Sequence, residues 1–415
     1  MKNEKKIWYP IYTICILFIL FFITIQLNNR VNSQDDFILI KRLKELGFWK
    51  SILSWEYNQR PVGHFFFNIT FYFNEKIETF KWSILISNLV FIIFFTHSIK
   101  LIINYTFRIY NITLEKKKIW SISFLIVMCT FFFVFERSEL WFWYICSLIY
   151  LLPVIFINYG VILMLSKTKK KWLSIIFFFL IGGELEIHIF ISFIILTMIY
   201  FNKLISLIKY IINVVSLLSL SILQLFNNGI ENRINLEKTS LLVESSTFTS
   251  TFTHLFDQKN IFFILILFSL LSVIPNKLKK IKLTKIFTQT FPILFLTFIA
   301  TLSVGKIVFT NSWGPLRIWG PFSIILMFTL ITIALSISAK IQDKIQIIGI
   351  LSSLSFMILF CVFSVKQYYI SSTYAKAYDQ VLKTNNKVKD KVDSGVLISP
   401  GHFDYLIEYH NSLKK

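Results

Sequence analysis

The sequence predicts an all-α polytopic membrane protein, with about eleven transmembrane helices and amphipathic surface helices in its first outer loop. Three observations lead to this fold class. Hydrophobic residues make up 55% of the 415-residue chain, aromatic residues 18%, and charged residues only 16%. The mean hydropathy is +0.65. A soluble domain of this length cannot bury so much apolar surface in one core, whereas lipid solvates it.

The predicted spans are apolar runs of about 20 residues flanked by lysine or arginine. They lie at 7–27, 82–104, 119–135, 143–166, 172–183, 187–202, 204–226, 260–275, 286–305, 318–338 and 344–365. The first run follows a basic N-terminus, as the apolar part of a signal peptide does. It is too long for one, and no small-residue cleavage site follows it. We therefore expect an uncleaved first helix.

The lysines between these runs predict the orientation of the chain. With the N-terminus in the cytoplasm, the short basic loops all fall on the inner face, as the positive-inside rule requires. They contain Lys116 to Lys118, Lys167 to Lys171, Lys203, Lys277 to Lys285, and Lys340 with Lys344. An odd number of spans then gives a transmembrane domain at 1–365 and an extracytoplasmic tail at 366–415. The net charge of +21 is thus interpreted as topology and contact with anionic membrane lipid, and not as nucleic-acid binding.

Two segments depart from a simple span. Counting the apolar residues 61–75 as a span would place the lysines at 116–118 outside, so we expect this segment to be re-entrant or interfacial. The spans 172–183 and 187–202 are short and meet at Gly182-Gly183-Glu184. We expect them to form a hairpin that ends at or below the outer surface, where protein or water must satisfy the backbone of the turn. Such irregular backbone usually borders a cavity.

The polar residues indicate that the protein works at its outer face. The cytoplasmic loops are short, whereas three outer segments, 28–81, 227–260 and the tail, are long. Between Phe37 and Trp55 the apolar residues recur at helical spacing. This pattern predicts one or two amphipathic helices along the membrane surface.

Asp35 and Asp36 begin this surface region, directly after the first span. Two adjacent carboxylates repel each other, which can keep one of them protonated for proton transfer or let the pair share a cation. The structural alternative is a solvated cap of the surface helix, because aspartate is common at a helix N-terminus.

Arg60, Arg233 and Arg317 are isolated arginines on the predicted outer face. Arg60 precedes a proline, Arg233 ends an Asn-Gly-containing segment after one span, and Arg317 follows a Gly-Pro pair before another. A guanidinium at headgroup depth suits bidentate contact with a phosphate. Interfacial snorkelling is the alternative for any single arginine.

Carboxylates and aromatic rings are combined at two predicted outer ends of helices. Glu136 and Glu139 precede an aromatic run that starts at Trp141, and Glu184 and Glu186 lie at the short hairpin. Carboxylates accept hydrogen bonds from sugar hydroxyls, and flat rings cover the apolar face of a sugar, so these residues predict a sugar site. The rings alone are weak evidence, because Trp and Tyr are enriched at every membrane interface.

No motif for nucleotide chemistry occurs in the sequence. It contains no Gly-rich phosphate loop, no HExxH helix, no Ser-centred elbow and no Cys/His cluster. His188 is interpreted as a contact between helices and not as a metal ligand. The four cysteines lie inside apolar runs without metal or redox spacing, so they are interpreted as small buried hydrophobic residues. A soluble nucleotide-dependent enzyme is not expected.

Taken in order along the chain, these features resemble the membrane glycosyltransferases of the C-type fold (GT-C), and among them the serotype-converting glucosyltransferase-like and related bacterial families. The likeness is carried by Asp35-Asp36-Phe37, Arg60-Pro61, Glu139 with Trp141, Tyr150 and Pro153, Glu186 after a Gly pair, the segment from Asn228 to Arg233, and the segment from Tyr374 to Asp379. The segment that ends at Arg233 differs from the corresponding Pro-Gly-Asn-x-x-Arg motif, because it lacks the proline.

The resemblance implies an inverting glycosyltransferase of a bacterial cell membrane. Its donor would be a polyprenyl-phosphate sugar, and its acceptor a cell-surface glycan or lipid-linked saccharide at the outer face. By this likeness one of Asp35 and Asp36 would be the general base that deprotonates the acceptor hydroxyl. Arg233 and Arg317 would neutralise the leaving phosphate.

The same resemblance assigns sugar orientation to Glu139 and Glu186. Members of the fold differ in metal dependence, so no cofactor is assigned and a divalent cation stays open. Two other functions remain. A transporter or flippase of lipid-linked saccharides would require paired polar residues at mid-membrane and related halves. A polysaccharide polymerase or ligase differs mainly in its acceptor. In a purely structural or sensory protein, Asp35 and Asp36 would be replaceable.

Overall fold

The computed structural model describes most of the transmembrane part of the chain. The described residues are 2–28, 34–53, 60–72, 77–133, 141, 147–166, 169–184, 186–225, 260–279, 291–301, 320–338 and 342–384. Within these ranges every regular element is a helix and no strand occurs. The all-α fold class is therefore confirmed for this part of the chain.

The helices follow one another along the chain with short connections. Their bounds are α1 Lys2–Asn28, α2 Gln34–Leu46, α3 Phe48–Leu53, α4 Pro61–Phe71, α5 Ile77–Ile109, α6 Lys116–Phe133, the π-helix η2 Ser147–Leu151, α8 Leu152–Leu165, the 3₁₀-helix η3 Lys169–Trp172, α9 Leu173–Gly182, α10 Glu186–Phe201, α11 Leu207–Leu225, α14 Asn260–Val273, α15 Asn276–Lys279, α17 Gly320–Ser338 and α18 Gln342–Thr384. A further apolar helix covers Phe291–Thr301.

Five helices are long and apolar enough to cross a membrane, which marks the chain as a membrane protein. They contain Trp8–Asn28, Lys81–Ile109, Ser147–Leu165, Gly320–Ser338 and Lys344–Thr373. Four shorter apolar helices accompany them, at Glu186–Phe201, Leu207–Ile222, Ile261–Val273 and Phe291–Thr301. Each of the eleven predicted spans overlaps a helix, but a helix of 10–17 residues is shorter than the hydrocarbon core of a bilayer unless the membrane thins around it. The count of eleven spans therefore stays a prediction.

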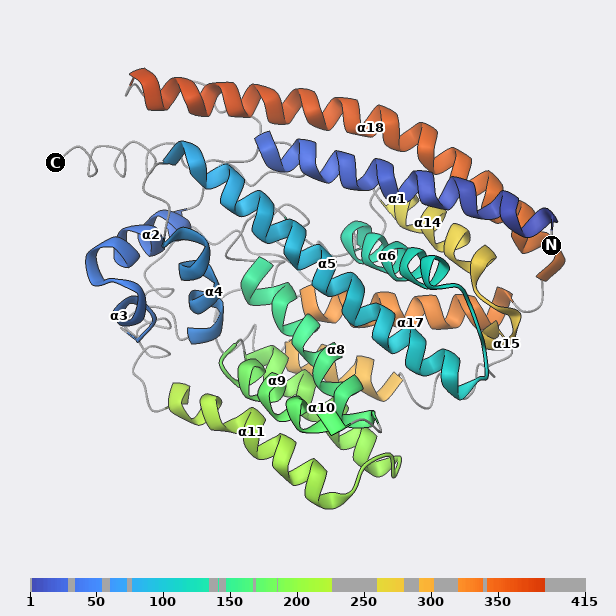
Figure 1. Ribbon diagram of the computed structural model, residues 1–415, viewed down its shortest axis with the longest axis horizontal. Helices are drawn as coiled ribbons and strands as arrows, with labels where there is room; N and C mark the ends of the chain where they lie inside the picture. The colour runs from blue at the N-terminus through green and yellow to red at the C-terminus, as the bar shows by residue number, and fades with distance from the viewer. Residues whose placement is uncertain are drawn as a thin grey trace.

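The first and last helices lie side by side along one edge of the bundle (Figure 1). Phe21 and Phe360 bring their rings to 4.9 Å, and Asn28 donates a hydrogen bond of 3.0 Å to the Ser371 hydroxyl. α18 does not end at residue 365, where the tail was predicted to begin, but continues to Thr384. The sequence gives no reason for a break there, because Ser and Tyr at 368–374 continue the helix without Gly or Pro.

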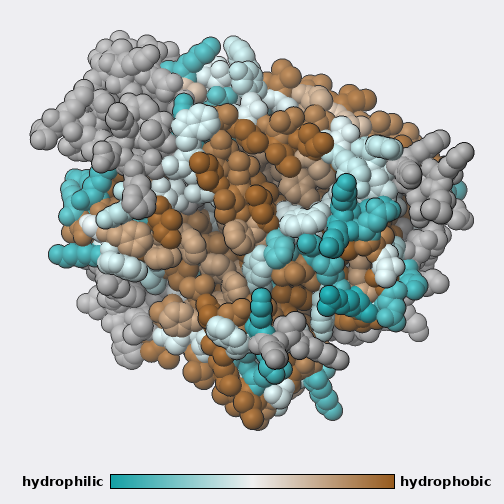
Figure 2. Space-filling view, viewed as in Figure 1, coloured by the Kyte–Doolittle hydropathy of each residue, from teal (hydrophilic) through white to brown (hydrophobic). Residues whose placement is uncertain are grey.

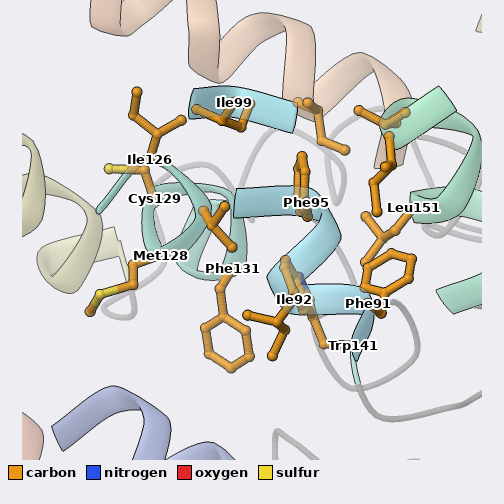
Figure 3. Close-up of a cluster of buried hydrophobic side chains, with 14 of the residues drawn as sticks. Phe91, Ile92, Phe95, Ile99, Ile126, Met128, Cys129, Phe131, Trp141 and Leu151 are labelled. Atoms are coloured by element: carbon orange, nitrogen blue, oxygen red, sulfur yellow. The ribbon is translucent and has the colours of Figure 1, made fainter. Parts of the chain in front are cut away.

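Phenylalanines form the centre of the bundle. Phe18 of α1 meets Phe131 and Phe132 of α6 at 5.0 and 6.0 Å, both in edge-to-face geometry. Figure 3 shows the neighbouring part of this core, where Phe95 of α5, Phe131 and Trp141 converge. Edge-to-face ring pairs add specific geometry to apolar packing, which lipid alone does not provide between helices.

The basic ends of several helices gather at one end of the bundle. In Figure 1 the N-terminus, α15 and the chain entering α6 all lie at the right end. Lys118 lies 5.6 Å from the Trp8 ring centre, and Lys277 donates a 3.3 Å hydrogen bond to the Asn111 carbonyl. Apolar side chains cover much of the visible surface between this end and the opposite one (Figure 2). This distribution is what the positive-inside rule requires of a cytoplasmic end.

The short helices α2, α3 and α4 lie at the opposite end of the molecule (Figure 1). α2 and α3 are the two helices that the apolar spacing predicted after the first span. α4, within the segment 61–75, has 11 residues and so rises about 16 Å, roughly half of the hydrocarbon thickness. It does not cross the membrane as a helix. Asn68 of α4 donates hydrogen bonds to the Phe48 carbonyl and the Ser51 hydroxyl, at 2.9 and 2.7 Å, which fixes α4 on α3.

The predicted hairpin between α9 and α10 is confirmed. α9 ends at Gly182, and α10 begins at Glu186 after a tight turn. A Cβ at Gly182 would collide with the Leu217 carbonyl of α11. Close backbone approach of this kind is how small residues pack membrane helices. The Ser221 hydroxyl, which lies 3.3 Å from the Gly182 carbonyl, adds a polar contact to the same crossing.

We expect Gly182→Ala to destabilise the folded protein by about 2 kcal/mol, because the new methyl group must push α9 away from α11. The measurement is thermal unfolding of detergent-solubilised protein. Ile176→Ala, on the lipid-exposed face of the same helix, is the matched control and should have a much smaller effect. Equal unfolding temperatures for Gly182→Ala and wild type would show that the helices do not need this close approach.

Candidate functional site

The N-terminus of α4 is the starting point of the candidate site. Arg60 occupies the N-cap position and Pro61 the first turn, where a missing N–H removes no helical hydrogen bond. The first N–H groups of a helix point outward without helical partners and carry partial positive charge. Arg60 is itself buried, with 8% of its surface exposed. A full positive charge and a helix N-terminus therefore meet below the protein surface.

The turn after α9 packs directly against this helix end. A Cβ at Gly183 would lie 2.7 Å from Val62 Cγ2, so a larger residue here would separate the turn from α4. Gly63 faces the carboxyl group of Glu184: a Cβ built on Gly63 would lie 3.6 and 3.7 Å from its two oxygens. The glycines of both elements thus allow the Glu184 carboxyl to reach the α4 N-terminus.

Glu184 is enclosed, with 1% of its surface exposed. Burial raises the pKa of this carboxyl well above its ordinary value, while the charge of Arg60 and the backbone N–H of Gly63 act in the opposite direction. Neither carboxyl oxygen has a hydrogen-bond partner among the described residues, so these interactions act across space. The carboxyl is therefore held close to protonation, beside a guanidinium that stays charged.

His188 joins α10 to the π-helix η2. Its Nε2 lies 3.1 Å from the Tyr150 carbonyl oxygen. A carbonyl only accepts, so Nε2 carries the proton, and in the neutral ring Nδ1 is left as an acceptor. Pro153 follows η2 and has no N–H to return to the preceding turn. The resulting wide turn frees a carbonyl for His188, and such π-turns frequently occur at functional sites.

Four side chains around this point contain buried polar atoms without a hydrogen-bond partner among the described residues. These atoms are His64 Nε2, both carboxyl oxygens of Glu184, His188 Nδ1 and Ser192 Oγ. Arg60 acts electrostatically on His64, Glu184 and His188, which places all three within its reach. Ser192 lies one turn after His188 on the same face of α10. Buried polar groups are normally satisfied, so this group indicates space for a polar ligand or for water.

The chemistry of the group suits an anion that also carries hydroxyls. Arg60 and the α4 N-terminus provide positive charge, and a protonated Glu184 adds none of the opposite sign. His188 Nδ1 and the Ser192 hydroxyl can accept or donate hydrogen bonds to alcohol groups. Among the described residues no three His, Cys, Asp or Glu side chains are grouped to hold a metal ion.

The structure brings together only part of the predicted site. Arg60, Glu184 and the backbone of Tyr150 converge, and His188 contacts another helix as expected. Glu186 is half-buried in the first turn of α10. Trp141 packs in the aromatic core, 5.4 Å from Phe131, which is not the position of a ring that stacks on a sugar. Asp35 and Asp36 lie in the first turn of α2, and their side chains lie outside the described residues, as do Glu136, Glu139, Arg233 and Arg317.

His64 and Ser192 were not among the predicted site residues. Both lie in apolar runs, where a single polar residue gives no chemical pattern. The available signal was spacing: His64 follows Arg60 by four residues, and Ser192 follows His188 by four, so each pair shares a helix face.

His64 predicts that acid destabilises the protein. Burial lowers the pKa of His64 from 6.5 to about 3, and Arg60 and Arg42 lower it in the same direction. The folded protein thus binds a proton at His64 less readily than the unfolded chain. Stability is present above the unfolded pKa and is lost as the pH falls toward the folded one, by about 3 kcal/mol between pH 7 and pH 4.

The measurement is the unfolding temperature in detergent as a function of pH, for wild type and for His64→Gln, whose amide does not titrate. We expect the variant to lose less stability than wild type on acidification. Glu184 acts in the opposite sense, because its raised pKa favours the folded protein at low pH, but it is present in both proteins. Parallel pH profiles would show that His64 is not buried as the structure describes.

No protein-family model, curated protein or solved structure matches the chain. The GT-C likeness therefore rests on the residues quoted above, and the function has to be argued from the chemistry of this site.

Proposed function

We propose that the protein is a membrane glycosyltransferase that moves a sugar from a polyprenyl-phosphate donor to a glycan or lipid-linked acceptor. It would act in the bacterial cell membrane, with its N-terminus in the cytoplasm and its site and C-terminal tail on the outer side. The observation that carries the proposal is the enclosed group formed by Arg60, Glu184 and His188 at the end of the bundle opposite the lysines.

The charge of this group supports a phosphate in preference to a neutral sugar alone. A polyprenyl-phosphate donor needs no nucleotide site; it needs positive charge at the depth of the lipid headgroups. Arg60 and the α4 N-terminus provide that charge in a place from which water is largely excluded. In such an environment positive charge is most effective against the negative charge that develops on the leaving phosphate in the transition state.

The remaining residues have roles that the proposal distributes between donor and acceptor. His188 Nδ1, the Ser192 hydroxyl and Glu184 would orient sugar hydroxyls. One of Asp35 and Asp36, in the first turn of α2, would take the proton from the acceptor hydroxyl as it attacks the anomeric carbon. The bond from that carbon to the phosphate oxygen then breaks, and the lipid phosphate leaves with inverted configuration at the sugar.

The test is an incubation of membranes that contain the protein with radiolabelled polyprenyl-phosphate sugars. Label should pass into material that no longer extracts with the donor lipid, and membranes without the protein should not transfer it. If the donor lipid crosses vesicle membranes in the presence of the protein but its sugar is never transferred, the protein is a transporter and the proposal is wrong.

A further inference from the structure

A cavity of about 530 Å³ lies beside the candidate site, between α4, α5, η2, α8 and α9. This volume is within the range of pockets that hold small organic ligands. Its wall is almost entirely apolar: Phe66, Ile69, Thr70, Ile86, Ser87, Asn88, Val90, Phe91, Phe94, His97, Ser147, Leu148, Leu152, Ile155, Phe156, Tyr159 and Phe177. A ligand that fills it must therefore be a hydrocarbon over most of its length.

The cavity is continuous with the candidate site through two elements. α4 contributes Arg60 and His64 to the site and, one to two turns later, Phe66 and Thr70 to the cavity wall. η2 contributes Leu148 to the wall and the Tyr150 carbonyl to His188. A molecule whose charged group lies at Arg60 can therefore place its next carbon atoms in the cavity.

The far end of the cavity is closed by a polar pair. His97 Nδ1 lies 2.7 Å from the Tyr159 hydroxyl, and the Tyr159 ring stacks on Phe177 at 5.2 Å. Along α5, His97 is about 16 Å from Ile86 at the other end. The side of the cavity is open, because Ile69, Ile86, Val90 and Phe94 are between 45% and 61% exposed. In a bilayer this side faces lipid.

We infer that this cavity binds the first isoprene units of the donor's polyprenyl chain, while the rest of the chain leaves through the open side into the bilayer. This inference rests on the proposed function and adds a specificity to it. Because the His97–Tyr159 pair ends the cavity, only a short length of chain contributes to recognition. Affinity should rise with chain length and then level off.

The experiment measures binding of radiolabelled geranylgeranyl phosphate to detergent-solubilised protein, without sugar or acceptor. Val90→Trp places a large ring in the cavity and should weaken binding about tenfold. Ile93→Trp is the matched control, since Ile93 is also lipid-exposed on α5 but does not line the cavity. Ile86→Trp is a second cavity variant in case Val90→Trp does not fold, and unfolding temperatures check all three proteins.

Competition by geranyl, farnesyl, geranylgeranyl and undecaprenyl phosphate tests the length limit. We expect geranyl phosphate to compete poorly and the two longest chains to compete equally. Equal binding by Val90→Trp and Ile93→Trp, or competition that ignores chain length, would overturn the inference while leaving sugar transfer untouched. Binding as expected in a protein that transfers no sugar would instead reject the proposed function and keep the cavity as a polyprenyl-phosphate site.

Discussion

In membranes with Arg60→Met, sugar transfer is expected to fall by about 10²- to 10³-fold. Methionine keeps the length and apolar contacts of the arginine stem but removes the positive charge beside Glu184. If that charge stabilises the leaving phosphate, its loss raises the barrier of the chemical step more than it weakens donor binding. The measurement is the rate of label transfer at saturating and at low donor concentration, with the amount of folded protein determined for each membrane.

Two matched variants separate this effect from general damage. Arg108→Met removes an exposed arginine near the opposite end of α5 and should transfer at the wild-type rate. Glu184→Gln keeps the size and polarity of the side chain but cannot ionise. Because burial keeps Glu184 close to protonation, this variant should retain activity within about tenfold of wild type.

The folding cost of Arg60→Met should be modest for the same reason. Removing one partner of a buried ion pair typically costs about 3–5 kcal/mol, because the other charge is left without compensation. Here Glu184 can remain neutral, so we expect a smaller loss. If Arg60→Met transfers normally, Arg60 is a structural cap of α4. If Glu184→Gln alone abolishes transfer, the ionised carboxylate is the active form, and the charge balance described above is wrong.

The positions of the helices could be predicted from hydropathy because lipid imposes one simple requirement, namely an apolar helix with internally satisfied backbone. The turn at Gly182-Gly183 and the two helices after the first span were predicted for equally local reasons: glycine ends a helix, and apolar residues recur at helical spacing. The number of spans was not settled by the same pattern, because α9, at 10 residues, is as apolar as a span without being as long.

Site residues were predictable only where residue type and chain position agreed. Arg60 and Glu184 are charges in apolar surroundings, and such residues are functional by default in membrane proteins. Trp141 has the right chemistry for a sugar site, but its neighbours decide its environment, and they are Phe95 and Phe131 from two other helices. No local pattern reports which rings will pack together across the bundle.

The second large effect concerns Asp35 and Asp36, which the proposed mechanism makes the candidates for general base. Asp35→Asn and Asp36→Asn, made separately, should leave insertion and folding intact, and at least one should reduce transfer by about 10²- to 10⁴-fold. Asparagine preserves shape and remains a good residue near a helix N-terminus, so the cap of α2 should survive either change. The assay is label transfer, accompanied by the unfolding temperature of each protein.

The pH dependence of the remaining activity distinguishes a base from a residue that only positions the helix. A general base acts in its ionised form, so the wild-type rate should fall at low pH, and the variant that removes the base should lose this acid limb. A positioning role would lower the rate equally at every pH. Full activity in both single variants would remove the base from α2. The proton acceptor would then have to be sought among the other groups near Arg60, of which His188 Nδ1 is the described atom best prepared to accept a proton.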